Sequence, residues 1–431
     1  MSHSVWNSSI TYKTGLWRRL EWVAVSVCLF INSGAVFQLL MMYPDEILDD
    51  MERAKMRLLK IPIYLLTLIF LAPHVRQLAL VAVRNLPFIM LIVLSAVSTL
   101  WSVNGSVTLR RSVSLLMATL LAMLITARFT PRQQVMLFGG TFGLCTILSL
   151  LLALTAPAMA FAPGESELRG IFTHKNVFGW IACYTAVFAV AMLRDPSPVV
   201  RKLGWTLFAT GFTGIVLSQS ATSLLGGIFA IISGFALQTV ARRDGASRLV
   251  TQLVLFQVIA IVVMVLTFNL QVLLETLGRD PTLTGRTELW AAVDPWIGDK
   301  LLFGYGYAAF WTESNPAVAQ IWDAIGWDAP GAHSSYRDLM LNFGLVGATL
   351  FCIVLIQAIR KGTVLLTTEP NEGWLWCLLI IGTSMLSGLS ETIMLDQDDV
   401  LFPTAVMTIA FRYAELTAGL PRHRRVAIAA A

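Results

Sequence analysis

The feature that most constrains this chain is its series of long apolar runs. A helix needs roughly 20 residues to cross about 30 Å of bilayer hydrocarbon, and this 431-residue sequence, which is 56% hydrophobic, has about twelve such runs. Because backbone polar groups in lipid must bond within the protein, the sequence predicts an all-α polytopic membrane protein with a single transmembrane domain over residues 1–431. The predicted spans are 20–42, 58–73, 84–101, 112–127, 134–156, 177–193, 203–218, 222–240, 249–268, 338–359, 374–390 and 400–416.

The distribution of charge predicts the orientation. Cytoplasmic loops hold an excess of Lys and Arg. If the spans alternate from a cytoplasmic N-terminus, most basic residues fall on the inner side and most acidic residues on the outer side. An even number of spans then leaves both termini in the cytoplasm. The net charge of +5 therefore reflects topology and gives no reason to expect nucleic acid as a partner.

One connection is much longer than the others. Residues 269–336 lie on the predicted outer side between the ninth and tenth spans, and loops of this length in compact structures are usually functional. Within them, 286-RTELWAAVDPWI-297 places apolar residues on one helical face, which predicts an interfacial helix on the outer leaflet. The segment also carries tryptophans at a density typical of the headgroup region; these are Trp290, Trp296, Trp311, Trp322 and Trp327.

A run of polar residues stands directly before the tenth span, in 331-GAHSSYRDLMLNFGLVG-347. Ser335 and Asp338 have the spacing of a capping box, so we expect a helix to begin near Ser334 or Ser335. His333 would then precede a helix N-terminus, where the helix dipole favours a neutral imidazole able to accept a proton. The alternative is a solvated loop histidine beside an ordinary helix cap.

A second polar cluster, 168-LRGIFTHKNVFGW-180, lies on the predicted outer side just before the sixth span. Arg169 and Lys175 are placed where the phosphate of a lipid-linked substrate would lie, and arginine binds pyrophosphate well because its guanidinium can donate two parallel bonds. The alternative is that both side chains only reach toward lipid headgroups.

Four weaker features complete the set. Arg286 opens the predicted interfacial helix, and Arg110 and Arg111 stand at the outer end of the fourth span, where they bind either an anion or the acidic loop 45–52. The polar turn 218-SQSATS-223 offers hydrogen bonds to sugar or phosphate, or only to itself. The acidic turn 391-ETIMLDQDD-399 is predicted to be solvated rather than a metal site. The five cysteines show no metal or disulfide spacing and are predicted to be buried apolar residues.

Five stretches, taken in order, resemble the O-antigen ligase and Wzy-type polysaccharide polymerase superfamily, and are most similar to its exopolysaccharide polymerase (ExoQ-like) branch. The similarity runs from about residue 90 to 360. Asn104-Gly105 departs from the Asp-Pro of many relatives, and Ala221 stands where a basic residue is frequent. The stretches are 98-STLWSVNGSVTLRR-111, 169-RGIFTHKNVFGW-180, 218-SQSATS-223, 285-GRTELWAAVDPWIGDKLLFGYGYAAFW-311 and 332-AHSSYRDLMLNFGLVG-347.

The resemblance implies a metal-independent, GT-C-like glycosyltransferase of the bacterial inner membrane that uses no cofactor. The large loop between helices 9 and 10, residues 269–336, would be periplasmic and would cap the active site. The donor would be an undecaprenyl-pyrophosphate-linked glycan and the acceptor a second glycan, with a chain-length-regulating co-polymerase as a further partner. The family's histidine falls on His333, and its two pyrophosphate arginines fall on Arg169 and Arg286.

These roles agree with the chemistry of the residues. Fixed cations stabilise a pyrophosphate leaving group, and a histidine can take the proton of an acceptor hydroxyl. Further expected pyrophosphate ligands are Lys175, Arg110 and Arg111, and further expected polar contacts are Asn176, Ser220 and Tyr336.

The resemblance favours a polymerase that joins undecaprenyl-pyrophosphate-linked repeat units, and two other functions remain open. A ligase that transfers finished glycan to lipid A-core or another acceptor would share the donor and the fold. A transporter of lipid-linked sugar or ions would place ionisable residues near the bilayer midplane, where these spans have almost none.

Overall fold

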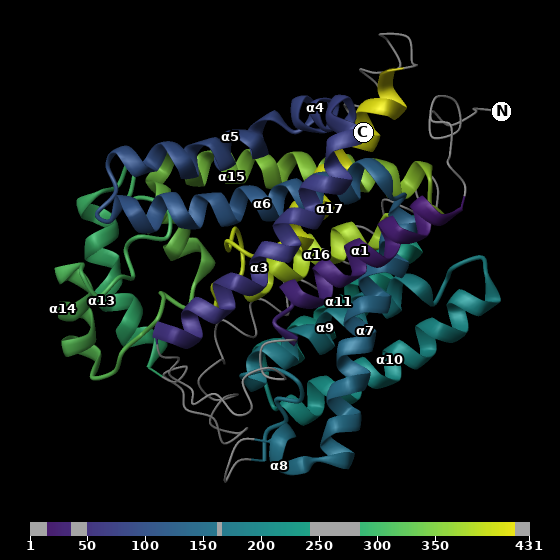
Figure 1. Cartoon of the computed structure of the whole chain (residues 1–431), viewed down its shortest axis with the longest axis horizontal. Coiled ribbons are helices and arrows are strands. Elements are labelled where there is room, and N and C mark those ends of the chain that lie inside the picture. The colour runs from purple at the N-terminus through teal and green to yellow at the C-terminus, as the bar shows by residue number, and fades with distance from the viewer. Residues whose placement is uncertain (1–14, 36–49, 162–165, 242–284, 419–431) are drawn as a thin grey trace.

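The computed structural model describes residues 15–35, 50–161, 166–241 and 285–418, which are mostly helical and contain no β-strand (Figure 1). Six helices in these ranges are long and apolar enough to cross a membrane: Leu58–Arg84, Gly105–Arg128, Pro131–Thr155, Lys175–Met192, Ala221–Ala241 and Ser335–Thr368. The chain is therefore an all-helical, multi-pass membrane protein. The total of about twelve spans stays a prediction, because the predicted span 249–268 lies outside the described residues. Every other predicted span overlaps a helix.

The helices form two neighbouring groups (Figure 1). In one group α5, α6, α15 and α17 pack side by side, and in the other α7, α9, α10 and α11 do. The α-helices are α1 (Leu16–Asn32), α3 (Asp50–Leu71), α4 (Val75–Arg84), α5 (Leu86–Val97), α6 (Gly105–Arg128), α7 (Pro131–Thr155), α8 (Pro157–Ala160), α9 (Lys175–Met192), α10 (Pro198–Ser218), α11 (Ala221–Ala241), α13 (Arg286–Asp299), α14 (Pro316–Ile325), α15 (Ser335–Thr368), α16 (Leu375–Ser387) and α17 (Leu401–Ala418).

The outer surface of the helices is apolar, as a lipid environment requires. Only 17% of the most apolar stretch of Leu58–Arg84 is buried within the protein, and Leu65 and Ile69 on it are each 55% exposed. Four of the five cysteines are buried, but Cys352 is exposed on α15, so the prediction of burial was wrong for that residue. An apolar side chain on the surface of a membrane span need not be buried within the protein itself.

Residues 285–334, here called the cap segment, form a compact unit beside the ends of the spans. The predicted helix 286–297 is confirmed as α13. Its Leu289 and Val293 are fully buried in an apolar cluster that consists mostly of cap-segment residues. The position of α13 on a lipid leaflet stays a prediction. Because the cluster also contains Leu341 of α15, the cap segment is packed onto the start of that helix.

Three indole N–H groups of the cap segment donate to protein groups. Trp290 donates to the carbonyl oxygen of Ala332 at 2.9 Å, and Trp322 donates to that of Ala329 at 2.9 Å. Trp311 donates to the carboxylate of Asp338 at 2.8 Å. These tryptophans therefore stabilise the segment from within, in addition to any contact with headgroups.

Helix α15 is interrupted at Gly344, where φ is 59° and ψ is −155°. The interruption frees two backbone N–H groups, and these bond to the cap segment: Leu345 donates to Leu301 O at 2.8 Å and Val346 donates to Leu302 O at 3.2 Å. A β-carbon at position 344 would lie 2.4 Å from the backbone of Leu302. The cap segment is thus seated in a break in a membrane helix that only glycine permits.

We expect Gly344→Ala to destabilise the protein by about 2 kcal/mol or more, because the substitution adds backbone strain at positive φ and a clash with Leu302. The measurement is thermal unfolding of the purified protein in detergent. The control is Gly298→Ala, at a position where an added β-carbon would meet nothing within 4 Å. Equal melting temperatures for the two variants would contradict this account of the break.

Candidate active site

A cavity of about 370 Å³ lies where the cap segment meets α6, α15 and residues 388–400, the loop between α16 and α17. Its wall brings together side chains that are far apart in the sequence. Among the lining residues, those with polar or ionisable side chains include Arg111, Trp311, His333, Asp338, Asn342, Glu391 and Asp396. A cavity with convergent ionisable groups is the usual form of an active site.

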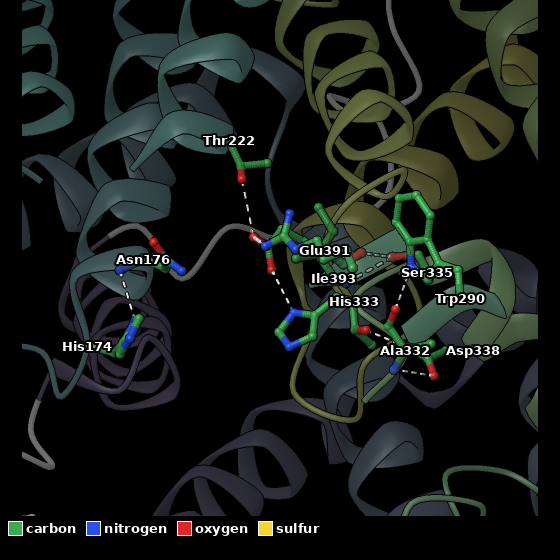
Figure 2. Close-up of polar contacts among 12 residues, drawn as sticks. His174, Asn176, Thr222, Trp290, Ala332, His333, Ser335, Asp338, Glu391 and Ile393 are labelled. Atoms are coloured by element: carbon green, nitrogen blue, oxygen red, sulfur yellow. Dashed lines mark hydrogen bonds and ion pairs between the residues drawn. The ribbon is translucent and has the colours of Figure 1, made fainter. Parts of the chain in front are cut away.

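His333 stands two residues before α15 in a left-handed backbone conformation, with φ of 45°. Its Nδ1 lies 3.6 Å from Oε2 of Glu391 (Figure 2). The centre of its ring lies 5.9 Å from that of Trp327. A carboxylate facing Nδ1 favours the tautomer that carries its proton there. Nε2 is then the nitrogen able to accept a proton.

Glu391 is the centre of the polar contacts in Figure 2. Its Oε1 accepts hydrogen bonds from Nη2 of Arg286 at 2.8 Å and from the hydroxyl of Thr222 at 3.2 Å, and its Oε2 faces His333. Burial alone would raise the pKa of this carboxyl, but the neighbouring His333 and Arg286 hold the pKa below its usual range. Glu391 is therefore an anion that joins α13, α11 and His333, which stands two residues before α15.

The turn 391–399 was predicted to be solvated, and this was wrong for three of its four carboxylates, those of Glu391, Asp398 and Asp399. The side chain of Glu391 is only 12% exposed. Asp398 pairs with Lys60 at 2.6 Å, and Asp399 accepts the backbone N–H groups at the start of α17. Asp396, the fourth, is exposed and faces the cavity. The loop folds back onto the spans, and acids in such a loop need partners.

The start of α15 also differs from the predicted capping box. The helix begins at Ser335 as expected, but no side chain caps it. The Ser335 hydroxyl instead donates to Glu391 O at 2.8 Å and accepts the N–H of Ile393 at 3.0 Å. The backbone N–H of Ser335 donates to Gly388 O at 2.9 Å. The loop after α16 thus takes the place of a local cap, which a pattern of four residues cannot reveal.

Arg111 and Arg110 differ sharply in their surroundings. Arg111 lines the cavity, and its Nη1 donates to Ala308 O at 2.6 Å. Arg110 is exposed. Their alternative predicted partner, the acidic loop 45–52, lies outside the residues whose side chains are described. Arg111 is therefore the member of the pair that the structure brings to the site.

The segment around Arg169 lies beside the polar turn 218–223. Leu168 donates its N–H to Leu217 O at 2.9 Å, and Gln219 donates to the Ser166 hydroxyl at 3.0 Å. The side chain of Arg169 is buried, and its Nε has no hydrogen-bond partner in the described part of the protein. A buried guanidinium N–H without a partner is a group that a ligand could satisfy.

Most of the remaining predicted ligands already have protein partners. Lys175 pairs with Glu167 at 2.7 Å. The backbone N–H of Asn176 donates to Nδ1 of His174 at 3.1 Å, and this bond caps the start of α9 (Figure 2). Ser220 is buried and accepts from the Ser223 hydroxyl at 3.0 Å. The Tyr336 hydroxyl donates to Met385 O at 2.8 Å. Roles in substrate binding for these residues stay predictions.

Residues 206–352 match the family model described as O-antigen ligase. The chain is also similar to the exopolysaccharide production protein ExoQ of Rhizobium meliloti (strain 1021), with 25% identity over 354 residues that cover 78% of this chain and 77% of the relative. The resemblance to the O-antigen ligase family is confirmed. The family match spans both Arg286 and His333, the two residues that meet at Glu391.

Sequence reasoning missed three residues of the site. Glu391 lies outside the matched range, and its sequence context predicts a solvated turn, although the predicted topology places that turn on the same side as His333. Thr222 stands out in the sequence only as part of a polar turn, and Asp338 only as part of a helix cap. Within the described residues, no group of three or more His, Cys, Asp or Glu side chains is arranged to hold a metal ion.

Proposed function

We propose that this protein is a glycosyltransferase that polymerises undecaprenyl-pyrophosphate-linked repeat units at the periplasmic face of the bacterial inner membrane. The observation that carries the proposal is the meeting of His333 and Arg286 at Glu391, beside a cavity of about 370 Å³ that Arg111 also lines. A proton acceptor beside fixed cations is what glycosyl transfer from a pyrophosphate needs. The similarity to an exopolysaccharide production protein supports polymerisation.

In the proposed reaction, Nε2 of His333 takes the proton of the acceptor hydroxyl as its oxygen attacks the anomeric carbon of the donor. The bond from that carbon to the pyrophosphate oxygen breaks, and the leaving group departs with the bonding electrons. A single in-line displacement inverts the configuration of the anomeric carbon. Glu391 stabilises the imidazolium that forms, since its carboxylate faces Nδ1.

Arginine side chains would hold the pyrophosphate. Glu391 contacts Nη2 of Arg286, and a guanidinium has further N–H groups available to an anion. Arg111 offers a second guanidinium on the cavity wall, and Arg169 offers a buried Nε that lacks a partner in the described residues. Neutralisation of Glu391 by Arg286 also limits its repulsion of the substrate.

We expect Arg111→Ala to lower the transfer rate by about 10- to 100-fold, because the substitution removes a cation from the cavity wall. Arg110→Ala is the matched control, since Arg110 is the neighbouring, exposed arginine of the same helix, and its rate should stay within about twofold of wild type. Rates are measured with the purified protein in lipid nanodiscs. Equal losses in the two variants would exclude a specific role for Arg111.

The direct test of function uses the full chain in vesicles with undecaprenyl-pyrophosphate oligosaccharide extracted from cells that lack the protein. Elongation of the glycan supports the proposal. Translocation of the substrate without bond formation would show a carrier instead. The family model's description as O-antigen ligase makes transfer to another acceptor the second candidate. Deletion separates the two enzymes, because loss of a polymerase leaves single repeat units and loss of a ligase leaves long lipid-linked polymer.

The membrane orientation is part of the same proposal. Both termini would lie in the cytoplasm, and the cavity would open to the periplasm. Single cysteines placed at exposed positions of the cap segment, labelled in intact cells with a membrane-impermeant maleimide, would react if the segment is periplasmic. Labelling only after lysis would reverse the orientation.

A further inference from the structure

Asp338 is a buried carboxylate that the proposed reaction does not use. It is the fourth residue of α15, is 6% exposed, and lies on the cavity wall. A buried carboxylate needs several hydrogen bonds to be stable. The hydrogen-bond donors to Asp338 therefore indicate its role in the structure.

The carboxylate of Asp338 accepts three hydrogen bonds, two from the cap segment and one from the loop 388–400. Oδ1 accepts the indole N–H of Trp311 at 2.8 Å and the backbone N–H of Ala332 at 3.3 Å. Oδ2 accepts the hydroxyl of Thr392 in a short bond. The donors thus include the residue before His333, Ala332, which Figure 2 shows beside Asp338, and the residue after Glu391, Thr392.

The bond to Ala332 bears on the backbone of His333. With φ of 45°, His333 has a conformation that residues with a β-carbon rarely adopt, and it persists only where neighbouring structure fixes it. The peptide groups of Ala332 are held on both sides, because its N–H donates to Asp338 and its carbonyl oxygen accepts from Trp290 at 2.9 Å. Asp338 thereby helps to set the direction in which the imidazole projects.

The bond to Thr392 bears on Glu391 in the same way. Thr392 follows Glu391 directly, and Glu391 O is also held by the Ser335 hydroxyl at 2.8 Å. Hydrogen bonds on both sides of a residue fix its backbone and so restrict its side chain. One carboxylate therefore connects the segments that carry His333 and Glu391, which must face each other at the site.

We propose that Asp338 is a positioning residue for the transfer reaction. Asp338 keeps His333 and Glu391 facing each other by accepting a hydrogen bond from the residue next to each of them. The inference rests on the proposed function. A carboxylate has about four acceptor positions, of which three are filled here, so Asp338 has little capacity left to act as a base or to bind substrate. Its effect on the reaction is therefore indirect.

The test compares Asp338→Ala with Asp338→Asn. An asparagine can keep all three contacts, because its side-chain oxygen accepts from Trp311 and Ala332 while its NH₂ group donates to the Thr392 oxygen. We expect Asp338→Ala to lower kcat by about 100-fold, as a misplacement of about 1 Å does. We expect Asp338→Asn to recover kcat to within about tenfold of wild type, with KM for the donor within about threefold in both variants.

Arg337→Gln is the control for a general loosening of the cap segment. Arg337 neighbours Asp338, forms two bonds to Asp294 of α13 at 2.7 and 3.0 Å, and lies 4.6 Å from the ring centre of Trp290. It contributes no hydrogen bond to the contacts of Asp338 with Trp311, Ala332 and Thr392. Its kcat should stay within about threefold of wild type. Should Asp338→Ala fail to accumulate in membranes, Thr392→Val removes a single bond and should lower kcat by about tenfold with KM unchanged.

The outcomes separate this inference from the proposed function. If Asp338→Asn is as inactive as Asp338→Ala in folded protein, the charge itself is needed and the positioning role is wrong. The inference also fails if Asp338→Ala keeps the wild-type kcat, or if Arg337→Gln lowers kcat as much as Asp338→Ala does. A wild-type protein that forms no glycosidic bond would instead overturn the proposed function. All rates use the undecaprenyl-pyrophosphate oligosaccharide and nanodiscs described above.

Discussion

His333→Ala is expected to abolish polymer formation while leaving the protein in the membrane at the wild-type level. The substitution removes the only imidazole on the described wall of the cavity, and loss of a general base costs about 10²- to 10⁴-fold in rate. The fold should survive, because the His333 side chain is 28% exposed and is not part of an apolar cluster. Polymer from cells is measured by gel electrophoresis, and the transfer rate is measured with purified protein.

The control is His174→Ala. His174 belongs to a neighbouring stretch of the family resemblance, but it is exposed and caps α9 through Nδ1. Loss of that cap costs about 1 kcal/mol of stability and should leave polymer length and yield unchanged. Wild-type polymer in His333→Ala cells would remove the catalytic assignment. A loss in both variants would show that the assay reports stability rather than chemistry.

Arg286→Ala is expected to lower the transfer rate by about 10²- to 10³-fold, the usual effect of losing a donor that stabilises developing negative charge. The variant also leaves Glu391, which is mostly buried, without its cationic partner at 2.8 Å. Arg286→Lys should recover part of the rate, because lysine keeps the charge but cannot bind a pyrophosphate through two parallel bonds. Arg169→Ala should lose activity to a similar degree. All variants are compared by rate at equal amounts in nanodiscs.

Arg286→Ala and Arg169→Ala are compared with lysine replacements at Arg110 and Arg111. The lysine variants should lose far less of the transfer rate. Donor binding is followed separately by displacement of a labelled polyprenyl pyrophosphate. If all four arginines tolerate substitution equally, the anion site lies elsewhere in the protein. If Arg286→Ala binds the donor as tightly as wild type but transfers slowly, Arg286 acts only in the transition state.

The spans could be predicted because a bilayer imposes a length and a composition on every helix that crosses it. Helices α6 and α7 lie where their apolar runs predicted. The break in α15 could not be predicted, since Gly344 lies within one continuous apolar run and a positive φ leaves no trace in hydropathy. The partners of Leu345 and Val346 come from residues more than 40 positions earlier, so only the folded chain reveals them.

The candidate site was predictable in part for the same reason. His333 and Arg286 stand in stretches whose residue types and order resemble a known family, and the structure brings both to Glu391. Glu391 itself follows another helix and carries no local pattern. Its burial depends on how the loop 388–400 folds back, and an isolated acidic turn in a sequence is more often solvated. The contacts of Asp338 are likewise tertiary.

The interruption of α15 at Gly344 has a consequence for how proteins of this kind could be recombined. The residues from Arg286 to Phe343 would be exchanged between relatives as one unit, the graft. They contain the cap segment, its apolar cluster and the part of α15 that precedes Gly344. A chimera that receives this graft from a relative would obtain the counterparts of Arg286 and His333 together, while the residues at positions 391 and 111 would come from the recipient chain. Swaps between relatives should therefore work only where the recipient offers a matching acid in the loop that corresponds to the one after α16.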